Sequence, residues 1–230
     1  MQSFDSSSVS RILGVPFSNA DFFQTALTHR SYLNEHRGYT LDHNERLEFL
    51  GDAVLELVVT EYLYHHFPNP EGELTSWRAA LVNGEMLSRV GGDLGIEPFL
   101  LMSRGEAKDT GRSRQYLIAN AMEAIIGALY LDQGYEAAKN FILRVIVSRL
   151  PHVFDQKLYA DPKSLFQEQA QTRLGITPSY RVLFESGPDH DKQFTAGAYL
   201  GEELIAEGMG NSKQEAQRFA AKNALEKKGW

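Results

Sequence analysis

Three carboxylates recur at helical spacing within one apolar stretch, residues 43–59. Glu45, Glu48 and Asp52 stand at positions i, i+3 and i+7. At about 100° per residue, an α-helix would hold them within an arc of about 60°. Leucine, valine and phenylalanine crowd the other positions, so such a helix would be buried on nearly every side. Buried carboxylates repel one another and lose hydration, and a bound divalent cation is the simplest compensation.

The alternative interpretation of this stretch is a solvated helix face, which acidic residues at helical spacing usually mark. The apolar residues on the rest of the circumference favour the cation site instead. Arg46 is the only lysine or arginine within the stretch, and helical geometry points it to another side.

A second apolar segment, residues 116–132, carries two polar side chains on one face. Asn120 and Glu123 are spaced i and i+3 and are the only polar side chains in its interior. The same segment has small residues that let another helix approach closely: Ala119, Ala121, Ala124, Gly127 and Ala128. If this helix packed against the helix at residues 43–59, the carboxylates and the amide of the two helices would lie close together.

The elements around these two segments are predicted to be helical up to residue 150. The first segment should run on to His66, and Pro68 and Pro70 then end it. The remaining helices are predicted at 5–13, 22–28, from 71 onward, around 94 and at 135–149. Residues 33–43 are expected to form a loop, and residues 151–160, which have no clear period, a linker.

The pattern changes after residue 160. A helix begins near Pro162, three strands follow at 178–184, 193–200 and 203–209, and a last helix spans 213–227. The predicted fold is therefore mainly α: an all-helical domain over residues 1–150, then a small α-β-β-β-α (α+β) domain over residues 161–230.

The composition restricts the class of protein. The 230 residues suffice for two domains, and 43% hydrophobic with 23% charged residues is typical of a globular chain. The absence of cysteine excludes disulfides and thiolate sites and suits a reducing compartment. The polar N-terminus does not resemble a secretory signal, and no apolar run is long enough to span a membrane. We expect a cytoplasmic protein.

The net charge of −7 argues at first sight against a nucleic-acid partner. The negative charge is concentrated in residues 1–160, which carry −6, while residues 161–230 carry only −1. An acidic protein can still bind RNA where its basic groups cluster, so net charge does not decide the partner.

Two stretches resemble known families. Asn-Glu-Arg-Leu-Glu-Phe-Leu-Gly-Asp-Ala-Val-Leu, residues 44–55, resembles the signature helix of the ribonuclease III family. The α-β-β-β-α order, with Gly-Pro-Asp-His between strands and Gly-Asn-Ser-Lys at the last helix, resembles the double-stranded RNA-binding domain. Together the two resemblances cover nearly the whole chain in the order that the family uses.

The resemblance implies a metal cluster formed by both apolar helices. In the family the second helix supplies an Asp and a Glu; Glu123 matches the Glu, whereas Asn120 stands where the Asp is expected. The implied ligands are Glu48, Asp52, Asn120 and Glu123, with Asp52, Glu123 and Glu45 in catalysis. Glu45 would act as a water-mediated ligand or as a contact across a dimer interface.

The chemistry implied is hydrolysis of double-stranded RNA. Two Mg²⁺ ions about 3.5–4 Å apart can activate water, align its attack and compensate charge on the leaving oxygen. Mg²⁺, with Mn²⁺ as a substitute, prefers oxygen ligands such as these. The family resemblance further implies a homodimer that leaves 5′-phosphate and 3′-hydroxyl ends with short 3′ overhangs, in the processing of ribosomal and other structured RNA.

The resemblance also implies which residues of the second domain bind RNA. Gln167, Glu168 and His190 would face minor grooves, and Ser212 and Lys213 would meet phosphates near a helix N-terminus. Gln214 and Glu215 follow where the family usually has further basic residues, so we expect weaker, salt-sensitive binding.

Asn120 leaves three interpretations open: a natural variant that works at higher Mg²⁺, an engineered change that holds substrate uncut, or an inactive RNA-binding protein. The first is favoured because the other carboxylates are intact. The main alternative function is a weakened or inactive double-stranded RNA-binding protein of the same architecture. A further alternative is an all-helical metabolic enzyme fused to an unrelated small domain.

Overall fold

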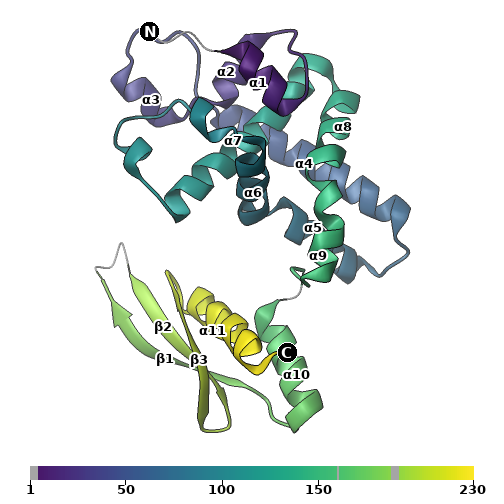
Figure 1. Ribbon diagram of the computed structural model, residues 1–230, viewed down its shortest axis with the longest axis vertical. Helices are drawn as coiled ribbons and strands as arrows, with labels where there is room; N and C mark the ends of the chain where they lie inside the picture. Colours follow the sequence, from purple (N-terminus) through teal and green to yellow (C-terminus); the bar gives the residue numbers. More distant parts are fainter. Residues whose placement is uncertain (1–4, 160, 188–191) are drawn as a thin grey trace. The chain divides into compact units, whose positions relative to one another are not determined.

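The computed structural model describes residues 5–159, 161–187 and 192–230. The chain divides into two compact units, Met1–Tyr159 and Ala160–Trp230, which we describe separately (Figure 1). The first unit is helical, and the second combines a small antiparallel sheet with two helices, which confirms the predicted fold class. Within the described ranges, no helix has both the length and the apolar character needed to cross a membrane.

The first unit is built around two long helices of 22 residues each, α4 and α7. They lie against each other, and shorter helices surround them (Figure 1). The helices, with η marking 3-10 turns, are α1 Ser6–Leu13, α2 Ala20–Ala26, α3 Arg30–Glu35, α4 Glu45–His66, α5 Glu71–Val82, α6 Gly84–Leu94, η1 Glu97–Phe99, η2 Glu106–Lys108, α7 Arg112–Gln133, α8 Tyr135–Val145, η3 Val147–Arg149 and α9 Leu150–Asp155.

Two glycines allow α4 and α7 to touch through their backbones. A Cβ atom at Gly51 would collide with the carbonyl oxygen of Glu123, and one at Gly127 would collide with the carbonyl oxygen of Leu47. Both glycines are buried. Any larger side chain at either position would push the two helices apart.

The beginning of α4 is fixed by the buried residue Asn44. Its backbone N–H donates to the carbonyl of Thr28 at 2.9 Å, and its side-chain amide donates to that of Ala26 at 3.4 Å. The preceding segment is not all loop as predicted, because α3 occupies residues 30–35. His29, whose ring nitrogen accepts from the Ser31 N–H, caps that short helix.

The prediction that α4 is buried on nearly every side is wrong for one face. Phe49 is 82% exposed and Leu57 is 56% exposed, and Tyr64 is exposed on the same face. The buried residues of the helix instead face α7 and its neighbours, as Val54, Leu55, Val58 and Val59 do. Periodicity alone cannot distinguish an apolar face that meets the core from one that is exposed in the single chain.

The segment expected to be a linker begins with a helix that packs on the first unit. α9 covers residues 150–155, and Phe154 contacts the Trp77 ring edge-on with centroids 4.7 Å apart. Tyr159 lies 6.3 Å from the same ring. These aromatic contacts hold the chain against the first unit as far as Tyr159.

The second unit has the predicted α-β-β-β-α order. Its elements are α10 Pro162–Leu174, β1 Ser179–Ser186, β2 Gln193–Leu200, β3 Glu203–Gly210 and α11 Lys213–Lys228. The three strands form an antiparallel sheet in the order β1-β2-β3, and α11 packs on it (Figure 1). Gly208 lets the backbone of α11 approach at Ala220, because a Cβ at this glycine would collide with the helix backbone.

Candidate functional site

The contact between α4 and α7 brings three predicted carboxylates together. Glu48 and Asp52 flank Gly51 on α4, and Gly51 rests against the backbone of Glu123 on α7. Glu48 and Glu123 are half-buried, and Asp52 is exposed. The glycine contact therefore sets the distance between the acidic groups of the two helices.

The electrostatics of these groups reflect their proximity. Burial, with the negative charges of Asp52 and Glu48, raises the pKa of Glu123 to about 7. Burial, with the charges of Glu45 and Asp52, raises the pKa of Glu48. Burial and the neighbouring negative charges make Glu48 and Glu123 harder to ionise, so the site favours a positive partner.

Asn120 lies one turn before Glu123 on α7 and is half-buried. The spacing puts its amide on the same side of the helix as the Glu123 carboxylate. Its oxygen could coordinate a cation without adding negative charge.

Glu45 lies at the first turn of α4, at the edge of this group. Its carboxylate forms an ion pair with Arg30, with Nη1 and Oε1 3.3 Å apart, and lies 3.9 Å from the His43 ring. It is exposed, and its charge is felt by Glu48. Arg30 is a cation that sequence reasoning missed, because nothing in the sequence links it to Glu45.

The donor set suits a hard divalent cation, since it offers carboxylate and amide oxygens and no sulfur. Among the residues that the structure describes, no three His, Cys, Asp or Glu side chains converge tightly enough to form a ready-made metal cage. The observation in favour of a cation is the mutual repulsion of Glu48, Asp52 and Glu123 across the contact.

Four of the predicted RNA-facing residues of the second unit lie on α10 or at the beginning of α11. Gln167 and Glu168 are exposed on α10. The Ser212 hydroxyl caps α11 by accepting from the Glu215 N–H at 3.1 Å. Lys213 is the first residue of α11 and is exposed. His190 lies outside the described residues.

Lys213 has a partner that sequence reasoning missed. Its Nζ lies 2.9 Å from Oε1 of Glu185, near the end of β1. The ammonium also lies 5.6 Å from the centre of the Phe194 ring. The sequence alone does not indicate this ion pair, because the two residues meet only when β1 packs beside the start of α11.

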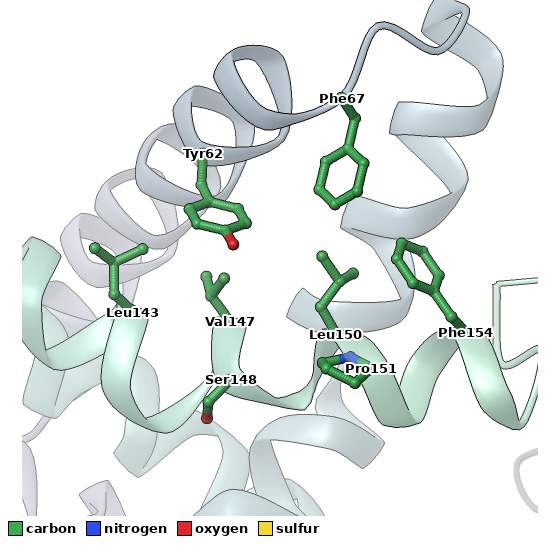
Figure 2. Close-up of a pocket in the computed structure, with 8 residues that line it drawn as sticks. All are labelled: Tyr62, Phe67, Leu143, Val147, Ser148, Leu150, Pro151 and Phe154. Atoms are coloured by element: carbon green, nitrogen blue, oxygen red, sulfur yellow. The ribbon is translucent and has the colours of Figure 1, made fainter.

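An apolar pocket of about 420 Å³ lies elsewhere in the first unit. Figure 2 shows the rings of Tyr62 and Phe67 facing the segment from α8 to α9. The pocket is lined by Tyr62, Phe67, Leu143, Val147, Ser148, Leu150, Pro151 and Phe154. None of these lining residues carries a carboxylate, an imidazole or an amine.

Sequence families match both units. The family described as Ribonuclease-III-like matches residues 19–150, and the double-stranded RNA binding motif matches residues 162–228. Together they account for the helical unit and the sheet-containing unit.

Curated relatives and a solved structure are similar to this chain over most of their own length. Ribonuclease 3 of Carboxydothermus hydrogenoformans is 44% identical, with 95% of this chain and 94% of the relative covered. Ribonuclease 3 of Borreliella burgdorferi is 42% identical, with 93% and 87% covered. The nuclease domain of ribonuclease III from Campylobacter jejuni is 40% identical with a TM-score of 0.58, covering 64% of this chain and 99% of that domain.

Proposed function

Because this chain belongs to the ribonuclease III family, we propose that it cleaves double-stranded RNA at the contact between α4 and α7. The chain is an endoribonuclease with a double-stranded RNA-binding domain. The proposal also covers the catalytic residues, the metal ion that they bind, the homodimer and the residues that contact RNA. The observation that carries it is the electrostatic coupling of Glu48, Asp52 and Glu123.

The proposed cation ligands are Glu48, Asp52, Asn120 and Glu123. Members of the family depend on a metal, and the oxygen-only donor set here favours Mg²⁺, with Mn²⁺ as a substitute. When bound, the ion supplies the Lewis acidity and the activated water that hydrolysis of a phosphodiester requires.

The chain's own residues prepare the site for that ion. The Glu123 carboxyl, with a pKa of about 7, holds a proton in part of the molecules at neutral pH and would hold a cation in its ionised form. Asp52 is exposed and reaches solvent, where a substrate phosphate arrives. Glu45, held by Arg30, lies at the edge and would orient water or contact a second subunit.

We propose that the chain acts as a homodimer through the first unit. The exposed apolar face of α4, which we define as Phe49, Leu57 and Tyr64, supports this assembly. The related Campylobacter jejuni nuclease domain has a region involved in dimer formation. Two sites related by symmetry would each cut one strand, leaving 5′-phosphate and 3′-hydroxyl ends with short 3′ overhangs.

The second unit is proposed to recognise the shape of the RNA duplex. Gln167 and Glu168 on α10 would face a minor groove, where 2′-hydroxyls are displayed. Ser212 and Lys213 at the beginning of α11 would meet phosphates, assisted by the helix N-terminus. We propose His190 as a further minor-groove contact.

The remaining parts of the proposal concern the RNA substrates, the cellular compartment and the domain boundaries. We propose processing of ribosomal and other structured RNA in the cytoplasm, which the absence of cysteine supports. We also propose a nuclease domain over residues 1–150 and an RNA-binding domain over 161–230, joined by residues 151–160, in which Phe154 and Tyr159 pack on the first unit.

A second candidate function is an RNA-binding protein with weak or no catalysis. Asn120 favours this function, because the site has one carboxylate fewer than the family pattern, which has an Asp at this position. Incubation of the chain with a long RNA duplex at millimolar Mg²⁺ distinguishes the two. We expect short duplex products that EDTA abolishes. Retained binding without products at any Mg²⁺ or Mn²⁺ concentration would favour the second candidate.

A further inference from the structure

Glu185 and Lys213 form an ion pair at the edge of the RNA-binding unit. Lys213 Nζ and Glu185 Oε1 are 2.9 Å apart, and the two side chains are 58% and 37% exposed. A phosphate can therefore reach the lysine while the carboxylate remains beside it. The hydrogen bond from Lys213 lowers the pKa of Glu185, so this carboxylate is ionised at neutral pH.

The same carboxylate also attracts a second cation. Lys192 Nζ, just before β2, lies 3.9 Å from Oε2 of Glu185. Glu185 thus stands between the start of β2 and the first turn of α11. Lys213 is the only lysine or arginine in that first turn, since Gln214 and Glu215 follow it.

We propose that Glu185 limits the affinity of this unit for double-stranded RNA by holding Lys213 until a phosphate replaces it. The inference rests on the proposed function, in which Lys213 contacts a phosphate. An incoming phosphate must separate the ammonium from Glu185, and it then lies close to a carboxylate that has lost the nearer of its two cations. Both effects oppose binding, and both disappear when the carboxylate is replaced by an amide.

The test compares two variants of the full chain that lose the same charge. Glu185→Gln removes the proposed competitor. Glu202→Gln is the matched control, because Glu202 is an exposed carboxylate of the same unit that pairs with Arg181 at 3.1 Å. Binding of a fluorescent RNA duplex of about 20 base pairs, somewhat longer than one such domain covers, is followed by anisotropy in EDTA.

We expect Glu185→Gln to bind about threefold more tightly than the Glu202→Gln control, the effect of one unit charge about 7 Å from a phosphate in water. Glu185→Asp should restore the affinity of the parent chain because it restores the charge. If Glu185→Gln is not folded at the assay temperature, Glu185→Thr replaces it, since threonine suits an exposed strand.

Two results would overturn the inference in different ways. Equal affinities of Glu185→Gln and Glu202→Gln, or weaker binding by Glu185→Gln, would contradict the role of Glu185 while leaving the proposed function intact. Failure of the parent chain to bind any RNA duplex would contradict the proposed function itself, and the inference with it.

Discussion

Gly51 of α4 rests against the backbone carbonyl of Glu123 on α7, and no side chain fits between them. The residue that closes the helix contact therefore lies beside a predicted cation ligand on the opposite helix. Packing of the core and geometry of the site depend on the same pair of residues.

Gly51→Ala should therefore reduce both stability and activity. The added methyl group must separate α4 from α7, and overpacking of this kind costs about 1–3 kcal/mol in the free energy of unfolding. Activity at saturating Mg²⁺ should fall more than tenfold, because the carboxylates of the two helices move apart. Urea unfolding and cleavage of an RNA duplex measure the two effects.

Gly92→Ala is the matched control for that prediction. Gly92 is exposed within α6, and a Cβ there would meet no atom within 4 Å. It should raise stability by about 0.5–1 kcal/mol, because alanine favours a helix, and leave cleavage unchanged. Similar losses in both variants would contradict the role of the helix contact.

Asn120→Asp should increase activity at limiting Mg²⁺. The new carboxylate adds a negative charge where we place the cation, and a unit charge about 4 Å away contributes on the order of 4 kcal/mol at an effective dielectric constant near 20, before desolvation. The Mg²⁺ concentration for half-maximal cleavage should fall by about tenfold or more. Cleavage rates across a Mg²⁺ titration provide the measurement.

Asn140→Asp controls for the added charge, because Asn140 is exposed on α8. It should leave the Mg²⁺ midpoint where it is in the parent chain. An unchanged midpoint for Asn120→Asp at every metal concentration would show that the assignment of Asn120 as a ligand is wrong.

The acidic group on the two long helices was accessible to sequence reasoning because its signals are local. The spacing of Glu48 and Asp52, and that of Asn120 and Glu123, fixes each pair on one side of its helix. The small residues of the second helix indicated a close approach, which Gly127 indeed provides. On the second helix, helical period and residue size thus predict the face that meets α4.

The contacts that sequence reasoning missed join residues from separate elements. The pairs Arg30 with Glu45 and Glu185 with Lys213 require the packed structure, because neither follows from a repeating spacing. The exposure of Phe49 was missed for a different reason. An apolar residue has the same period whether it faces the chain's own core or an open surface.

Removal of metal should make stability depend on pH through Glu123. Its pKa is raised from an ordinary value of 4.5 to about 7, so the folded state resists ionisation more than the unfolded state does. Below pH 4.5 Glu123 is protonated in both the folded and the unfolded state, so it does not reduce the free energy of unfolding. As the pH rises from 4.5 to 7, the unfolded state ionises first and the free energy of unfolding falls. Above pH 7 this loss is complete. Stability in EDTA should therefore fall across this range.

Glu123→Gln removes that titration, so comparison with the parent chain isolates it. Relative to this variant, the parent should lose about 1 kcal/mol between pH 5 and 8, after allowance for solvent screening of a partly exposed group. Urea unfolding in EDTA at several pH values gives the difference, and Mg²⁺ should reverse the loss at pH 8. Parallel pH profiles for the two proteins would contradict the coupling.

Phe49→Glu should convert the proposed homodimer into a monomer that keeps its fold. Phe49 is 82% exposed in the single chain, so a charged side chain there costs little in the folded subunit. In a dimer that covers the exposed apolar face of α4, the carboxylate would be buried without a partner, which is strongly unfavourable. Sedimentation equilibrium gives the mass, and circular dichroism gives the helix content.

Phe184→Glu, at an exposed position of β1, is the control and should remain dimeric. A dimer that persists in Phe49→Glu would exclude this face as the subunit interface, whereas a folded monomer that no longer makes double-strand cuts would tie the assembly to the chemistry.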